Sequence, residues 1–93
     1  MIFEWDEAKS EGTHRRRGFA FSDVARVFSD PQRLERIDKR RNYGEERRQT
    51  VGEIDGKTFF VAFMFRGSTV RIISARRANE QEDAAYRKST AWR

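Results

Sequence analysis

The strongest hydrophobic pattern of the chain lies in its middle, where two apolar segments flank a turn. Residues 47–54 and 57–65 are predicted to be strands, and Asp55-Gly56 between them is the dipeptide that favours a two-residue hairpin turn. The second segment is apolar at every position from 59 to 65. Such a run predicts a strand at the centre of a sheet, with both of its faces covered.

Three further segments have strand character. Residues 69–75 follow a tight turn at residues 66–68, and their apolar side chains alternate over both faces of the predicted strand. Residues 2–5 and 34–38 are shorter and weaker candidates. A basic loop is expected at residues 39–44, because that segment has no core pattern.

Helix signals occur on both sides of the strand pattern. Asp6 is an N-cap for a first helix that runs to about residue 16, and Gly18 ends it. A second helix is predicted from apolar residues at positions 21, 24, 25 and 28, with Ser22 as its N-cap. Asp30-Pro31 stops this second helix, because a residue before proline avoids helical geometry.

The C-terminal segment carries a capping box. Asn79 is the predicted N-cap of a helix over residues 80–89, with Glu82 three residues on. The whole order predicts one α+β domain over residues 1–93. We expect a mainly antiparallel sheet of four to five strands, with two N-terminal helices and one C-terminal helix.

The composition limits the classes of binding partner to be expected. Twenty Lys and Arg against fifteen Asp and Glu give a net charge of +5 and a pI near 10.2. Nucleic acid is therefore a leading partner, although an acidic protein partner or simple solubility would also account for this charge. The chain has no cysteine and one histidine, so neither a metal site nor a cofactor is expected. No apolar run approaches the roughly 20 residues of a membrane span, which favours a cytoplasmic protein with no membrane partner.

Arginines beside the last predicted strand are the main chemical signal. Arg71, Arg76 and Arg77 would be fixed cations next to a rigid sheet, which suits a phosphodiester. The alternative is structural: these arginines are solvated strand ends, or they pair with nearby carboxylates. The carboxylates in question are Glu80, Glu82 and Asp83.

A set of short motifs, taken in order and spacing, resembles the BrnT family of bacterial type II toxins. The motifs are Phe3-Glu-Trp-Asp-Glu-Ala-Lys9, Phe28-Ser-Asp-Pro31, Gly44-Glu-Glu-Arg47, Arg66-Gly67 and Arg71-Ile-Ile-Ser-Ala-Arg76, followed by Glu82 and Tyr86. The resemblance covers almost the whole chain. One position departs from it, because family members commonly have Lys-His-Gly where this chain has Arg16-Arg17-Gly18. A histidine base at Arg17 is thus not available here.

The resemblance implies a RelE-like fold and a ribonuclease that shuts down translation. It also implies a cognate BrnA antitoxin with a ribbon-helix-helix-type DNA-binding domain, which neutralises the toxin in a higher-order complex. RNA is then the substrate. The alternative function is a non-catalytic RNA- or ribosome-binding domain, in which the same arginines only contact phosphates.

RNA cleavage without a metal needs a base for the 2′-hydroxyl, an acid for the leaving 5′-oxygen, and cations near the phosphorane. Arg71 and Arg76 are the predicted phosphate ligands, and Glu45 and Tyr86 are the candidates for proton transfer. The structural alternative for Glu45 is an ion-pair partner, and the structural alternative for Tyr86 is a packed ring. His14 is a weaker candidate, because it lies outside the family's pattern. The predicted RNA-binding residues are Lys9, Arg17, Arg47 and Arg77.

Overall fold

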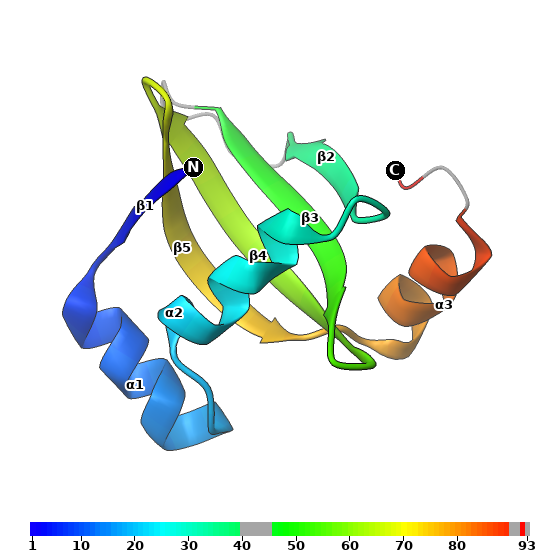
Figure 1. Cartoon of the computed structure of the whole chain (residues 1–93), viewed down its shortest axis with the longest axis horizontal. Coiled ribbons are helices and arrows are strands. Elements are labelled where there is room, and N and C mark those ends of the chain that lie inside the picture. Colours follow the sequence, from blue (N-terminus) through cyan, green and yellow to red (C-terminus); the bar gives the residue numbers. More distant parts are fainter. Residues whose placement is uncertain (40–45, 90–91, 93) are drawn as a thin grey trace.

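A computed structural model describes residues 1–39, 46–89 and 92 of the chain. Within these residues five strands form one sheet, in the order β1-β5-β4-β3-β2 (Figure 1). The strands are β1 (Ile2–Trp5), β2 (Leu34–Asp38), β3 (Arg47–Ile54), β4 (Lys57–Arg66) and β5 (Thr69–Arg77). The helices are α1 (Glu7–Arg17), α2 (Phe21–Val24) and α3 (Glu80–Lys88), and a 3-10 segment η1 (Ala25–Ser29) continues α2.

The predicted α+β class is confirmed, and the sheet is mixed. β1 pairs in parallel with β5, whereas the other three pairings are antiparallel. The hairpin of β3 and β4 turns at Asp55 and Gly56, whose φ angles of 50° and 83° are the positive values that a type I′ turn requires. β4 is the central strand, as its continuous apolar run predicts. That the fold is RelE-like in particular stays a prediction.

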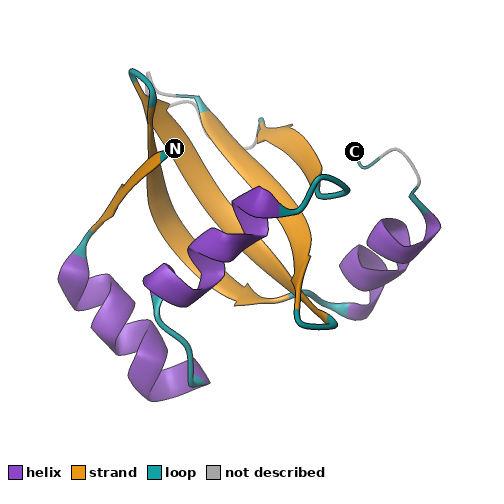
Figure 2. Cartoon of the chain, viewed as in Figure 1, coloured by secondary structure: helices purple, strands orange, loops and turns teal. Residues whose placement is uncertain are grey.

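One face of the sheet is covered by α2 and η1, which cross it in Figure 2. Phe21, Val24 and Val27 are fully buried there, against the β4 residues that point toward them. The rings of Phe28 and Phe63 meet edge to face at 4.8 Å between centroids. This layer is the larger of the two hydrophobic clusters and holds the helices to the sheet.

The second helix begins differently from its prediction, whereas its helical turns end at Ser29, before Asp30-Pro31, as predicted. Its N-cap is Ala20, not Ser22, because the Asp23 carboxylate accepts the Ala20 N–H at 2.7 Å and so satisfies the helix start. Ser10 of α1 accepts the Phe21 N–H at 2.9 Å, which fixes α1 against this start. After Val24 the coil tightens to 3-10 geometry, with the Asp30 N–H donating to the Val27 carbonyl at 3.0 Å.

The opposite face is covered only in part, by α3. Tyr86 packs there against Val51 and Phe60. The predicted capping box at the start of α3 is confirmed: the Asn79 side chain accepts the Glu82 N–H at 2.8 Å, and Glu82 accepts the Asn79 N–H at 2.9 Å. In the part of the chain that is described, no helix is long and apolar enough to pass through a membrane.

Candidate functional site

A β-bulge in β5 decides which face each arginine occupies. The pairing with β4 runs from Phe63 opposite Ile72 to Ala62 opposite Ser74, so Ile73 is an extra residue. Arg71 and Arg76 are five positions apart and would point to opposite faces of a regular strand. The extra residue changes the phase and places both arginines on the face that α3 partly covers. The predicted uninterrupted alternation over residues 69–75 was therefore wrong.

Strand register brings other polar side chains to the same face. Arg71 lies opposite Met64, which lies opposite Arg47, and Ser74 lies opposite Ala62, which lies opposite Gln49. Arg36 of β2 pairs in turn with Gln49. We call this set the arginine face, and it consists of Arg36, Arg47, Gln49, Arg71, Ser74 and Arg76. Ser74 is exposed and the four arginines are half-buried, so solvent reaches this face.

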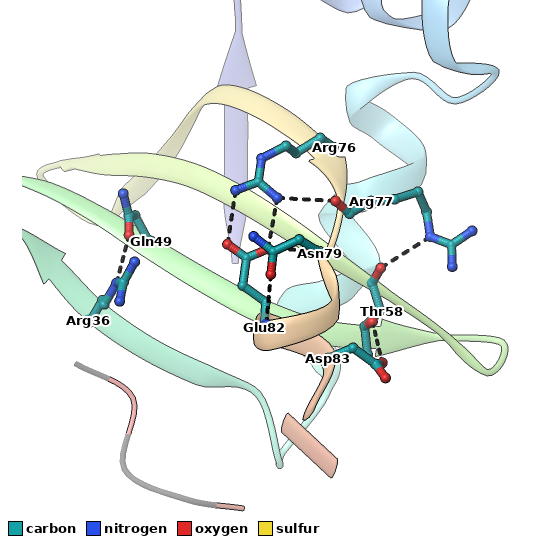
Figure 3. Close-up of polar contacts among 8 residues, drawn as sticks. All are labelled: Arg36, Gln49, Thr58, Arg76, Arg77, Asn79, Glu82 and Asp83. Carbon is teal, nitrogen blue, oxygen red and sulfur yellow. Dashed lines mark hydrogen bonds and ion pairs between the residues drawn. The ribbon is translucent and has the colours of Figure 1, made fainter. Parts of the chain in front are cut away.

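Arg76 is held in a fixed orientation. Its Nη1 and Nη2 donate to the two carboxylate oxygens of Glu82 at 2.8 and 2.9 Å, and Nη1 also donates to the Arg77 carbonyl at 3.2 Å (Figure 3). The guanidinium lies over the Phe60 ring, 4.0 Å from its centroid. Among the described residues, no acceptor meets Nε. The edge formed by Nε and Nη2 can thus still donate two parallel hydrogen bonds to a phosphate.

Glu82 orients Arg76 and also caps α3. Burial alone would raise the pKa of this carboxyl, but the hydrogen bonds from Arg76 and from the Asn79 N–H, with the charge of Arg36, hold the pKa below its usual value. Glu82 is therefore ionised at neutral pH. The sequence predicted its capping role, which is confirmed. The structural alternative for Arg76, an ion pair with a nearby carboxylate, is also correct, and the carboxylate is that of Glu82. This ion pair leaves one edge of the Arg76 guanidinium available.

Arg71 is positioned from the other end of the chain. Its Nη1 donates to Glu4 of β1 at 2.9 Å, because the parallel pairing places Glu4 beside Arg71. Both side chains remain partly exposed, at 28% for Arg71 and 37% for Glu4. Sequence reasoning missed Glu4, since a partner 67 positions away leaves no periodic signal.

Arg36 and Gln49 were also missed. Arg36 donates from Nε to the Gln49 side-chain oxygen at 2.8 Å, and Figure 3 shows the two side by side on β2 and β3. The Trp92 ring stacks on Arg36, with 3.9 Å between the guanidinium carbon and the ring centroid. The available signal was the alternation of positions 34, 36 and 38, which places Arg36 on one face of the predicted strand.

The remaining predicted residues that the structure describes are not members of the arginine face as defined above. Tyr86 is buried and its hydroxyl donates to Asp30 at 2.5 Å; burial and this hydrogen bond raise its pKa to about 12. Arg77 points to the other face, where Nε donates to the Thr58 carbonyl at 3.3 Å. Lys9 and Arg17 lie on α1, beside the edge of β5. Glu45 lies outside the described residues, as does most of the basic loop.

The described residues contain no group of three or more His, Cys, Asp or Glu side chains placed to hold a metal ion. The positive charge of the arginine face is carried by the guanidinium groups of its four arginines. Such groups stabilise developing negative charge on phosphoryl oxygens when they are preorganised.

Comparison with known proteins gives one clear result. The family model described as "Ribonuclease toxin, BrnT, of type II toxin-antitoxin system" matches residues 5–82, a range that includes all six residues of the arginine face. A search of curated proteins finds no match to the chain. A family match over most of the chain, together with an arginine-lined face, leads to one conclusion. The chain belongs to the BrnT family of ribonuclease toxins, which act with an antitoxin in type II toxin–antitoxin systems.

Proposed function

We propose that this toxin cleaves RNA on the arginine face, without a metal ion, and so inhibits translation in the cytoplasm. The observation that carries the proposal is the common orientation of Arg71 and Arg76, which the bulge at Ile73 produces. Two preorganised guanidinium groups on one solvent-accessible surface match the charge that gathers on a phosphorane.

The reaction consists of an in-line transfer. The 2′-oxygen attacks phosphorus as a base removes its proton, and the bond to the 5′-oxygen breaks as that oxygen takes up a proton. The products are a 2′,3′-cyclic phosphate and a 5′-hydroxyl. Arg76 donates from Nε and Nη2 to the nonbridging oxygens, and Arg71 adds a second cation. Losing one such preorganised donor typically costs about 3 kcal/mol, or roughly 10² in rate.

The base is assigned among carboxylates near this face. Glu4 is a candidate among the described ones, because it contacts Arg71 and keeps more exposure than Glu82, whose side chain is 9% exposed. Glu45 stays a candidate from sequence. A catalytic role of Tyr86 also stays a prediction, although its hydroxyl already donates a hydrogen bond to Asp30.

The antitoxin that pairs with this toxin is, in our proposal, of the BrnA type, with a ribbon-helix-helix-type DNA-binding domain. It would cover the arginine face with acidic side chains and assemble with the toxin into a higher-order complex. Long-range attraction to a +5 protein makes such association fast and salt-dependent. An association rate that stays flat between low and physiological salt would contradict an electrostatic interface.

The direct test is RNA cleavage by the purified protein, with and without a chelator, followed by mapping of the product ends. The proposal predicts equal rates in both conditions and cyclic phosphate ends. Cleavage that the chelator abolishes would contradict metal independence. RNA that is bound but never cut would indicate a binding module instead.

A further inference from the structure

A groove lies beside β5, where β1 no longer covers it. β1 pairs with β5 only as far as Ile72, and in the described part of the chain no strand pairs with the same edge from Ile73 onward. α1 runs beside this open edge instead (Figure 1). A groove of about 500 Å³ separates the two elements, and its lining includes Lys9, Gly12 and Arg16 of α1 with Ile73 and Ser74 of β5.

The groove carries cations for which the described residues offer no acidic partner. Four exposed cations of α1 line it, and none has a carboxylate within ion-pair distance among the described residues; they are Lys9, Arg15, Arg16 and Arg17. By contrast, Arg71 and Arg76 are each paired with a glutamate. The one carboxylate in the lining is Asp6, whose Oδ1 accepts the Ala8 and Lys9 N–H groups at 2.9 and 3.3 Å as the N-cap. The groove is therefore strongly positive. An anion can bind these four cations without displacing a carboxylate of the described residues.

Helix stability does not explain this charge pattern. Arginines in the last turn complement the negative end of the helix dipole, but Lys9 is in the first turn, where a cation is unfavourable. Gly12 also lies inside α1, where glycine costs about 1 kcal/mol relative to alanine. A Cβ at Gly12 would lie 3.0 Å from Arg16 Nη1, so the absence of a side chain lets Arg16 fold back over the helix toward the groove.

The groove meets the arginine face at Ser74. This residue is exposed and lies between Arg71 and Arg76 along β5, and it also lines the groove. We propose that the RNA strand cut on the arginine face continues over the β5 edge into this groove, where its flanking phosphates bind Lys9 and Arg16. The groove is thus a binding site for single-stranded RNA outside the cleaved bond, and this inference rests on the proposed function.

The first test measures binding of a fully 2′-O-methylated single strand, which lacks the attacking hydroxyl. The double variant Lys9→Gln/Arg16→Gln is compared with Lys57→Gln/Lys88→Gln, which removes the same charge from two exposed positions outside the groove. Affinity is measured against salt concentration. The groove variant should lose about 0.7 in the logarithmic salt slope for each phosphate contact removed. The control variant should keep the parent slope, and thermal melts of both should match the parent.

The second test separates the groove from the chemistry. The groove variant should raise KM for a long RNA, and this rise should exceed any change that the variant causes in KM for a dinucleotide. Equal salt slopes and equal KM values in the two variants would overturn the groove assignment while leaving the proposed function intact. Unchanged RNA binding with slower antitoxin association would also overturn it, in favour of an acidic protein segment. If the parent cuts neither substrate, the proposed function fails, and binding of the methylated strand still decides the groove.

Discussion

On the helix-covered face of the sheet, Phe63 and Ile72 are almost fully buried, whereas on the opposite face Arg71, Ser74 and Arg76 remain accessible to solvent. Both sets come from β4, β5 and their neighbours. The difference arises from cover: α2 and η1 span the first face, but α3 packs over only the Phe60 end of the second. The half-covered face is the one on which the arginines gather. One sheet thus separates the residues that stabilise the fold from the residues we assign to catalysis.

The largest effect on stability is expected on the covered face. Phe63→Ala should lower the free energy of unfolding by about 3–5 kcal/mol, because it leaves a cavity in the buried hydrophobic cluster to which Phe63 belongs. Ser74→Ala, exposed on the other face, should stay within about 0.5 kcal/mol of the parent. Urea denaturation measures both. Similar losses in the two variants would show that the faces do not divide these tasks.

Arg71→Ala, on the half-covered face, should lose activity and keep its stability. Its cleavage rate should fall by roughly 10², the usual cost of one preorganised charge, while its melting temperature changes little. Growth arrest on expression should weaken accordingly, and a thermal melt reports whether the variant is folded. Full toxicity of a folded Arg71→Ala protein would remove this residue from the site.

Tyr86→Phe examines a contact at the border of the two regions. Losing the hydrogen bond to the Asp30 carboxylate should cost about 1.5–3 kcal/mol of stability. The folded protein raises the Tyr86 pKa from 10.0 to about 12, so this stabilisation is complete below pH 10 and is lost as the pH rises toward 12. The stability difference between parent and variant should therefore shrink across that range. A difference that stays constant with pH would contradict the contact, and a loss of cleavage greater than the loss of folded protein would support a catalytic Tyr86.

Glu82→Gln tests the orientation of Arg76. Glutamine keeps the capping box but leaves Arg76 one bond to an uncharged amide oxygen in place of two bonds to a carboxylate, so kcat should fall by about tenfold. Because the Glu82 pKa is lowered, the ion pair should be intact at pH above 4.5 and break only as the pH falls below that value.

The matched control for Glu82→Gln is Asn79→Ala. It removes the other half of the capping box and should cost about 1 kcal/mol of stability. Its kcat per folded molecule should equal that of the parent, since it leaves Glu82 and Arg76 in contact. If Asn79→Ala lowers kcat as much as Glu82→Gln does, the effect belongs to α3 as a whole and not to Arg76.

The parts of the fold that follow from local signals were predictable. The hairpin at Asp55-Gly56, the central position of β4 and the cap of α3 depend on turn residues, an apolar run and a capping box, each contained in a few neighbouring positions. The start of α2 was missed because Ser22 and Asp23 are both residue types that favour a helix start. The observed start at Ala20 depends on the hydrogen bond from the Ala20 N–H to the Asp23 carboxylate.

The site was predictable only in part. Arg71 and Arg76 stand out by type, but their common face depends on the bulge, and the apolar pair Ile72-Ile73 gives no sign of an extra residue. Glu4 and Arg36 reach the site through strand pairings that join distant segments. Such register is set by the packing of the whole sheet, so a single sequence does not reveal it.

The most direct test of this account compares two adjacent arginines that the sheet separates. Arg76→Ala and Arg77→Ala remove the same group from neighbouring positions, one on the arginine face and one on the other face. RNA cleavage by Arg76→Ala should fall by roughly 10², and Arg76→Lys should also be impaired because a point charge cannot replace the planar fork. Arg77→Ala should lose only ~0.2–1 kcal/mol of RNA-binding free energy, as for an exposed charge. Equal losses in the two alanine variants, or full activity of Arg76→Ala, would contradict the assignment of catalysis to the arginine face.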